Sequence, residues 1–184
     1  MDAKIRQQLD RLHSKDANQR NASFEYLDQL AYGPVDWAYE AWDELLALTR
    51  SRDNHERTIA VQLLSGLAKS DPEERVLKDL DILMVVTKDE KFVTARHSLQ
   101  SLWKIGAAGK KQQKAIVAGL SRRFRECIEE KNCTLIRYDI LEVFRKIYDL
   151  APDRALKDMA LTLIDLEEDP KYRKKYTTLW RKSV

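Results

Sequence analysis

The sequence predicts an all-α protein, an α-α superhelix of about five helix pairs that forms a single domain over residues 1–184. Glycine and proline are scarce, at 5 and 4 of 184 residues, which disfavours sandwiches and barrels and favours helices. The second observation is a repeat in the pattern of apolar residues. Apolar residues recur on one helical face in successive units of 36 to 41 residues, a period that is typical of an α-solenoid.

One arginine in each unit defines the register of the repeat. These arginines are Arg20, Arg57, Arg96, Arg137 and Arg173. Seven residues after them stand Leu27, Leu64, Trp103, Phe144 and Trp180. Offsets of three, six and seven residues lie on one face of a helix. We therefore expect the five large apolar residues to occupy equivalent buried positions.

Each arginine-bearing helix is preceded by a second apolar helix. The ten expected helices cover residues 2–14, 17–31, 37–50, 54–68, 72–87, 90–105, 110–129, 133–149, 152–165 and 170–182. The turns inside the pairs are opened by Asp16, Asp53, Asp89, Asn132 and Asp169, which favours N-capping. Pro170 and Pro72 suit the first position of a helix. Glu74 is expected to close a capping box three residues after Asp71.

The two best units resemble a known repeat. Residues 53–67, DNHERTIAVQLLSGL, and residues 89–106, DEKFVTARHSLQSLWKIG, resemble the second half of a repeat in the HEAT/armadillo-type α-solenoid family. The other units fit more loosely. The resemblance covers almost the whole chain and implies a helical repeat fold. It also implies a binding scaffold more often than an enzyme, although a fold does not settle a function.

The resemblance gives the arginines a structural interpretation. In that family the Asp and Arg residues of neighbouring repeats form hydrogen-bonded ladders that set the stacking. This implies a structural ladder of Arg20, Arg57, Arg96, Arg137 and Arg173. The surroundings of Arg137 and Arg173 are basic, so binding to phosphates remains open for these two.

Charge is unevenly distributed along the chain. Residues 1–92 hold 13 basic and 18 acidic residues, whereas residues 93–184 hold 20 and 12. The candidates for binding nucleic acid or an acidic partner are Lys110, Lys111, Lys114, Arg122, Arg123, Arg125, Lys171, Arg173, Lys174, Lys175, Arg181 and Lys182. In the second cluster the basic residues alternate with Tyr172, Tyr176 and Trp180, a pattern that can bind nucleic acid through charge and stacking. Alternatively, the aromatic residues pack on the preceding repeat and both clusters are solvated. The acidic stretch from Glu25 to Glu44 suits a basic partner or water.

Sequence motifs give little support for catalysis. His13, His55 and His97 occupy different repeat offsets, so no metal site is expected, and no HExxH motif, P-loop or glycine-rich nucleotide motif occurs. No cofactor is expected either. Enzymes with a HEAT-like fold include DNA-alkylation-repair glycosylases, in which Trp and Asp residues lie in a basic groove. Asp36, Trp37 and Trp42 offer those residue types, but they lie in the acidic half of the chain, which would repel DNA. Alternatively, Trp37 and Trp42 are buried in the core. The spacing of Cys127 and Cys133 fits no redox or metal motif, and we expect free thiols.

These observations favour a small scaffold or adaptor. We expect it to bind a protein partner along the face formed by the second helices of the pairs. The alternative is that the basic C-terminal half binds nucleic acid. A glycosylase-like activity on DNA is one form of this alternative. No secretory signal is visible, and the longest apolar run, Ile82 to Val86, is too short to span a membrane. The expected location is therefore the cytoplasm.

Overall fold

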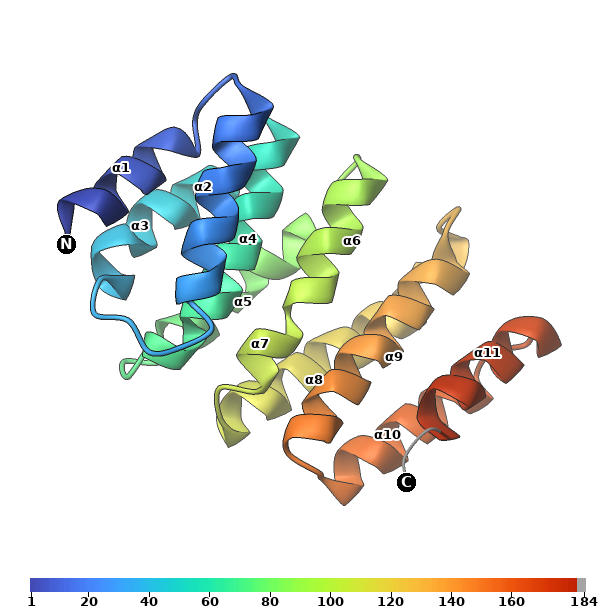
Figure 1. The fold of residues 1–184 in the computed structure, drawn as a ribbon. Helices are drawn as coiled ribbons and strands as arrows, with labels where there is room; N and C mark the ends of the chain where they lie inside the picture. Colours follow the sequence, from blue (N-terminus) through green and yellow to red (C-terminus); the bar gives the residue numbers. More distant parts are fainter. Residues whose placement is uncertain (182–184) are drawn as a thin grey trace. The chain divides into compact units, whose positions relative to one another are not determined.

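Five helix pairs form the architecture of residues 1–181, the part of the chain that the computed structural model describes. This range contains no strand. The first helices of the pairs are α1 (Ala3–Arg11), α3 (Ala38–Leu48), α5 (Arg75–Val86), α8 (Lys110–Glu126) and α10 (Arg154–Asp165). The second helices are α2 (Ala17–Leu30), α4 (Asn54–Leu67), α6 (Phe92–Ser101), α9 (Cys133–Leu150) and α11 (Pro170–Arg181). The predicted all-α repeat is confirmed (Figure 1).

Three short segments interrupt the pattern of regular pairs. The 3₁₀ turns η1 (Ala68–Ser70) and η2 (Cys127–Glu129) follow α4 and α8, and α7 (Trp103–Gly106) follows α6. The chain divides into two compact units, of which the first spans Met1–Ile105 and the second begins at Gly106. A single domain over the whole chain remains a prediction.

In the first unit the second helices form the centre. α4 packs against α2, α3, α5 and α6. Gly66 permits the close approach of α2, because a Cβ atom at Gly66 would lie 2.9 Å from the Cβ of Ala31. A larger residue there would force the two helices apart.

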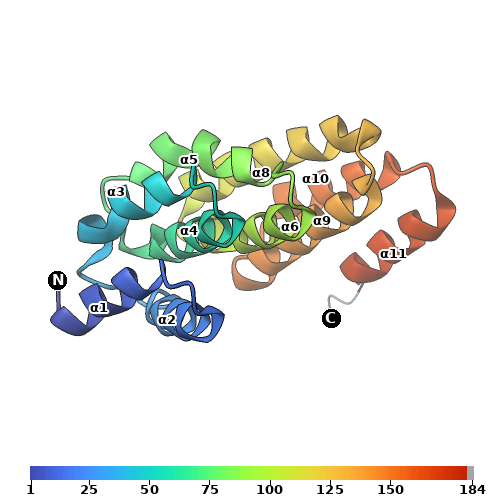
Figure 2. The same cartoon turned by 90° about the horizontal axis from the view of Figure 1, so that it is seen from above.

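In the second unit the four long helices form two layers. α8 packs against α9 and α10, whereas α11 packs against α9 and α10. In the view of Figure 2, α8 and α10, the first helices, lie in one layer, and α9 and α11, the second helices, lie in the other.

Acidic N-caps begin several helices as expected. The side chains of Asp16, Asp53 and Asp169 accept hydrogen bonds from the backbone nitrogen two residues later, at 2.9, 2.7 and 2.8 Å. These bonds satisfy backbone donors that lack a partner within the helix. The cap in the fourth pair differs, because the side chain of Asn132 makes no capping hydrogen bond.

The expected start of the third pair was wrong. α5 begins at Arg75 and not at Pro72, because Glu74 adopts a left-handed backbone with φ 55° and ψ 34°. An extra turn therefore precedes the helix. Asp71 caps the helix across this turn, and its carboxylate accepts hydrogen bonds from the backbone nitrogens of Arg75 and Val76 at 2.9 and 2.7 Å.

Four of the five expected core positions are buried. Leu27, Leu64, Phe144 and Trp180 are inaccessible or nearly so. Trp103 is only half-buried, so its expected equivalence was wrong. Trp103 follows a break in the helix, because α6 ends at Ser101 and α7 begins at Trp103. Its neighbours Leu102 and Ile105 are fully buried.

Replacing Leu64 with alanine should destabilise the protein by about 2–5 kcal/mol, because it leaves a cavity at a fully buried position. The measurement is chemical unfolding followed by circular dichroism. Val85→Ala is the control. Its side chain is 70% exposed on α5, and the change should stay within about 0.5 kcal/mol. Equal effects of the two substitutions would contradict the assigned repeat register.

Candidate binding surfaces

The arginine of a repeat connects its helix to the preceding turn. Three of these arginines donate to the backbone oxygen six residues before them: Arg20 to Ser14 at 2.9 Å, Arg57 to Ser51 at 2.9 Å and Arg173 to Glu167 at 2.7 Å. In each case the acceptor lies just beyond the end of the first helix of the pair. Carbonyl groups at helix ends lack intrahelical donors, so the guanidinium groups satisfy backbone acceptors that would otherwise need water.

Two arginines also bind an acid of the following pair. Arg57 binds Asp89 through two hydrogen bonds, at 2.6 and 2.9 Å. Arg137 binds Glu167 at 3.0 Å. Burial, the largest single influence, would raise the pKa of Asp89. The hydrogen bonds from Arg57 and from the backbone of Lys91, together with the positive charges of these two residues, outweigh burial, so the pKa lies below its ordinary value. These two guanidinium groups are engaged within the protein, which leaves them poorly placed to bind phosphates. Arg96 lies over the ring of Phe92, 5.9 Å from its centre.

The basic cluster on α8 is smaller than the sequence suggests. Its exposed members are Lys110, Lys111, Lys114, Arg122 and Arg125. Arg123 does not belong to this surface, because its side chain is 1% exposed. Both terminal nitrogens of Arg123 bind the carboxylate of Glu130.

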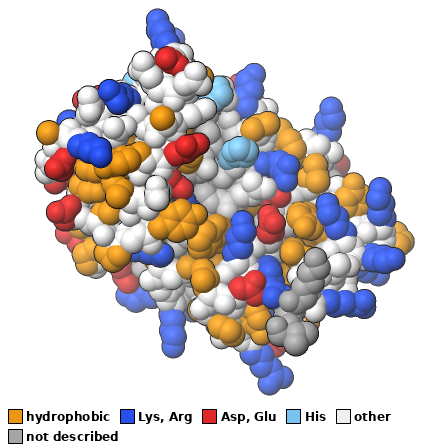
Figure 3. All heavy atoms as spheres, in the orientation of Figure 1, with side chains coloured by type: hydrophobic (Ala, Val, Ile, Leu, Met, Phe, Trp, Pro, Cys, Tyr) orange, Lys and Arg blue, Asp and Glu red, His pale blue; other side chains and the backbone are white. Residues whose placement is uncertain are grey.

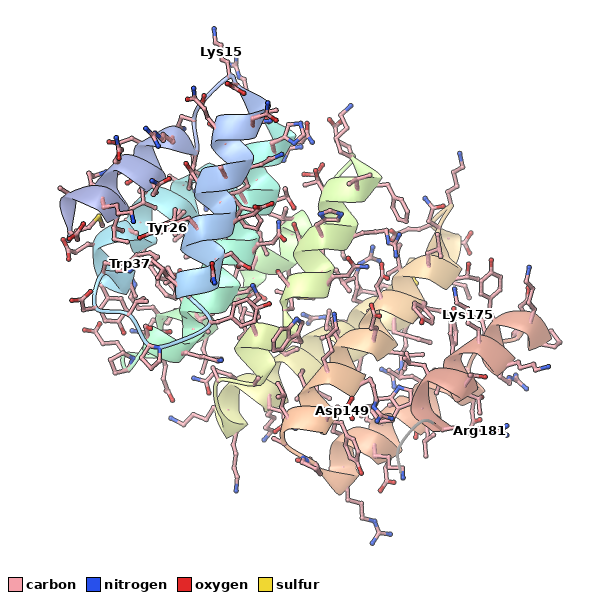
Figure 4. All side chains as sticks on the ribbon, in the orientation of Figure 1. Lys15, Tyr26, Trp37, Asp149, Lys175 and Arg181 are labelled. Atoms are coloured by element: carbon pink, nitrogen blue, oxygen red, sulfur yellow. The ribbon has the colours of Figure 1, made fainter. Side chains whose placement is uncertain are left out.

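The basic cluster on α11 lies in the other layer. Lys171, Arg173, Lys174, Lys175 and Arg181 are exposed, and Lys182 lies outside the described residues. Lysine and arginine side chains stand out on this part of the surface in Figure 3, and Figure 4 labels Lys175 and Arg181 on α11. Because α11 and α8 belong to different layers, the two clusters do not form one continuous surface.

The aromatic stripe of α11 belongs largely to the core. Tyr176 and Trp180 are buried. The hydroxyl of Tyr176 donates to the backbone oxygen of Thr134 in α9 at 2.6 Å, and burial raises the pKa of Tyr176 well above its ordinary value. The ring of Trp180 packs against Tyr148, with 5.7 Å between ring centres. These two rings are therefore not available for stacking on nucleic-acid bases.

An apolar groove of about 540 Å³ lies between α8 and α10. The residues that line it are Lys110, Gln113, Lys114, Val117, Ala118, Asp153, Ala155, Leu156 and Met159. Five of the nine carry apolar side chains. The two lysines both come from α8, so the groove joins an apolar surface to the basic cluster of that helix. The lysines could be identified from the sequence. The groove could not, because its apolar residues come from two separate helices, α8 and α10.

The acidic stretch of the first unit is largely neutralised by internal ion pairs. Glu44 binds Arg6 at 2.7 and 2.8 Å, and the hydrogen bond from Arg6 lowers the pKa of Glu44. Asp28 binds Lys104 at 2.6 Å. Asp43 binds Arg75. These pairs weaken the expectation that the stretch attracts a basic partner.

Two of the three residues considered for a glycosylase-like site are buried, and the third, Asp36, is exposed. Trp37 and Trp42 are buried in the first unit, as the alternative interpretation expected, and Figure 4 labels Trp37. The indole nitrogen of Trp42 donates to Asp79 at 2.9 Å. Among the described residues there is no group of three His, Cys, Asp or Glu side chains that could hold a metal ion.

A smaller pocket, of about 210 Å³, lies on the second helices of the first unit. Tyr32, His97 and Trp103 are among its lining residues, with the ion-paired Asp28 and Lys104. Its carboxylate is thus already bound to a lysine.

In the part of the chain that the structure describes, no helix is long and apolar enough to cross a membrane.

Comparisons with known proteins address the fold. No protein-family model and no curated protein matches the sequence. An engineered protein solved by the Northeast Structural Genomics Consortium aligns with 98% of this chain and 78% of its own, at 16% identity and a TM-score of 0.54. A second engineered protein from that consortium aligns over 98% of both chains, at 12% identity and a TM-score of 0.52. At such identities these likenesses concern the fold alone, an all-α fold built from successive helix pairs.

Another similar structure is a designed armadillo repeat protein in complex with the peptide (KR)4. It aligns with 97% of this chain and 99% of its own, at 12% identity and a TM-score of 0.46. At such identities the likeness concerns the fold of the solenoid alone. The partner and the binding surface must be inferred from the side chains of this chain.

The Arg57–Asp89 pair should make stability depend on pH. Asp89→Asn should cost about 1–3 kcal/mol at neutral pH, because it weakens two hydrogen bonds to a charged group. The folded-state pKa of Asp89 is below its ordinary value of 3.8. Its contribution is therefore present above that pH and is lost as the pH falls through the lower folded-state value. The difference in unfolding free energy between the wild-type protein and Asp89→Asn should therefore become smaller as the pH falls.

Asp158→Asn is the matched control for this measurement. Asp158 forms an exposed ion pair with Arg154 at 3.7 Å within α10, and exposed pairs contribute little. Denaturant unfolding of both variants at neutral and acidic pH tests the difference. A structural role for the Arg57–Asp89 pair would be contradicted if Asp89→Asn lowered the unfolding free energy no more than Asp158→Asn does.

Proposed function

We propose that this solenoid is a scaffold that binds an acidic, amphipathic segment of a partner protein in the groove between α8 and α10. The observation that carries the proposal is the combination of an apolar groove with a basic rim. Nucleic acid would be attracted by the rim but would gain little from apolar side chains. A helix with apolar residues on one face and carboxylates beside them would use both.

The apolar side of the groove suits the face of a helix. Val117 and Ala118 come from α8, and Leu156 and Met159 come from α10. Amphipathic helices bind such grooves through apolar residues spaced three and four positions apart. Methionine adapts its shape to different side chains, so Met159 favours contact with more than one apolar residue type.

The basic side of the groove gives the charge preference. Lys110 and Lys114 line it directly, and Arg122 and Arg125 are exposed further along α8. Positive charges at the start of a helix oppose the helix dipole, by about 0.3–1 kcal/mol each. Folding alone therefore does not favour the lysines of the first turn. Binding to carboxylates would explain their position.

Two other polar residues line the groove, Asp153 and Gln113. The carboxylate of Asp153 is directed to its own helix, where it accepts hydrogen bonds from the backbone nitrogens of Ala155 and Leu156 at 2.7 and 3.4 Å. The side-chain nitrogen of Gln113 is buried without a hydrogen-bond partner. A buried donor without an acceptor is unfavourable, and a side-chain movement that exposes it would let it bind a carbonyl or carboxylate of the partner.

This proposal changes the location of the site that we expected from the sequence. The expected face was that of the second helices, whereas α8 and α10 are the first helices of their pairs. The second-helix layer of the same unit has a pocket of about 370 Å³ lined by Tyr138, Lys171, Lys174, Lys175, Thr178 and Leu179. Three of its six lining residues are lysines, and it offers less apolar surface than the α8–α10 groove.

The test uses a labelled helical peptide with leucines at i, i+3, i+4 and i+7 and glutamates at the flanking positions. Fluorescence anisotropy should show binding to the wild-type protein that weakens at least tenfold, or about 1.4 kcal/mol, in the variant Lys110→Glu/Lys114→Glu. The substitutions place acids at a helix start, so they should not impair folding. Met159→Ser should also weaken binding.

The matched control reverses two charges in the other layer. Lys171 and Lys174 are exposed on the first turns of α11, so Lys171→Glu/Lys174→Glu makes the same change in charge at a helix start. The proposal requires that this variant binds the peptide nearly as well as the wild-type protein does. Equal losses in both double variants would contradict it, as would equal binding of a peptide with serines in place of its leucines.

Nucleic acid is the alternative outcome of the same experiment. Duplex DNA that competes with the peptide, binds with a steep dependence on salt and is unaffected by Met159→Ser would favour the nucleic-acid hypothesis. DNA contacts would then involve the exposed cations of α8. Binding to protein requires the apolar residues of the groove, whereas binding to phosphates does not.

A further inference from the structure

The two cysteines of the chain lie side by side at the turn between α8 and α9. Cys127 is the first residue of η2, and Cys133 is the first residue of α9. Both are free thiols in the structure, as the sequence analysis expected, and their sulfur atoms are 2.8 Å apart. A disulfide bond has a length of about 2.05 Å, so small movements of the two side chains would allow the bond to form.

We propose that Cys127 and Cys133 are a site of reversible disulfide formation that closes the turn between α8 and α9. Oxidised glutathione, or another small-molecule disulfide, is the class of oxidant. The spacing of the two residues matches no redox motif, and it is the fold of the turn that brings them together. This inference does not depend on the proposed partner of the α8–α10 groove.

Neighbouring contacts hold the turn in the geometry that the disulfide needs. The thiol of Cys127 lies 3.4 Å from the backbone oxygen of Phe124 and 3.8 Å from that of Cys133. The ion pair of Arg123 with Glu130 joins α8 to the same turn. Because the two sulfurs are already positioned, bond formation within the chain is favoured over reaction with a second molecule.

The environments of the two sulfurs indicate which one reacts first. Cys127 is fully buried, whereas Cys133 is partly exposed. Burial raises the pKa of Cys127 to about 12, with a further contribution from the adjacent Cys133. Thiolates are the nucleophiles in this chemistry, so Cys133 is the residue that meets the oxidant, and Cys127 resolves the product.

The reaction has two balanced steps. In the first, the Cys133 thiolate attacks one sulfur of glutathione disulfide, which forms a mixed disulfide and releases one glutathione thiolate. In the second, Cys127 gives its proton to that thiolate or to water and attacks the sulfur of Cys133. The bond between Cys133 and glutathione breaks, and a second glutathione thiolate leaves. Two protein thiols are oxidised, and one small disulfide is reduced to two thiols.

The experiment incubates the full chain with excess oxidised glutathione and follows thiol content and intact mass. Because Cys127 and Cys133 are the only cysteines, every loss of thiol is assigned to them. We expect the wild-type protein to lose both thiols. Its mass should fall by that of two hydrogen atoms, and no glutathione should remain attached to it. Dithiothreitol should restore both thiols. The oxidised protein should also unfold at a higher temperature than the reduced protein, because the bond restricts the unfolded chain.

Single substitutions test the order of the steps. Cys127→Ser should retain one glutathione on Cys133, because the resolving thiol is missing. Cys133→Ser should react much more slowly while folded, and at an ordinary rate once denatured. Cys127→Ala is a second variant for the buried position, in case serine impairs folding, and circular dichroism verifies both.

Several results would overturn the proposal. They are the persistence of both thiols in the oxidised wild-type protein, a stable glutathione adduct on it, and a disulfide that joins two chains on non-reducing gels. Equal rates for Cys127→Ser and Cys133→Ser would overturn the order of attack. These results can be interpreted even if no peptide binds the α8–α10 groove, because thiol content and mass do not depend on a partner.

Discussion

The architecture of this protein depends on a guanidinium group placed at the turn within a helix pair. Where Arg20 and Arg57 donate to backbone oxygens six residues earlier, the second helix is joined directly to the end of the first. The same side chain of Arg57 continues to Asp89 in the next pair. The side chain of Arg57 therefore contacts both the end of the first helix of its own pair and an acid of the next pair. This explains why the repeat is most visible in the sequence around its arginines.

The same constraint decides which charges are available for binding. Buried arginines that bind carboxylates, such as Arg137 and Arg123, contribute little to the outer electrostatic surface. The remaining positive charge of the second unit is mostly that of lysines, separated by the two layers of helices. A groove on one layer therefore experiences a different field from a pocket on the other. Position within the pair, and not net charge alone, distinguishes the two basic clusters.

Much of the fold could be predicted from the sequence, because the period, the N-caps and the buried positions are local patterns. The exceptions have local causes that a periodic pattern does not contain. Glu74 adopts a left-handed conformation that delays α5, and Trp103 follows a break in its helix and is only half-buried. The site was less predictable. Lys110 and Lys114 were identified, but Met159 gains its importance only from the packing of α10 against α8.

The short reach of the arginine bond has a consequence for how such chains change in length. Arg20 and Ser14 are separated by six positions, so the bond is encoded entirely within one helix pair. A gene duplication that copies a pair would copy this connection intact, without a compensating change elsewhere. The Arg57–Asp89 bond, by contrast, requires an acid at the correct place in the neighbour. Where the inner connection occurs, it is thus carried within one pair, whereas the outer connection depends on residues of two pairs.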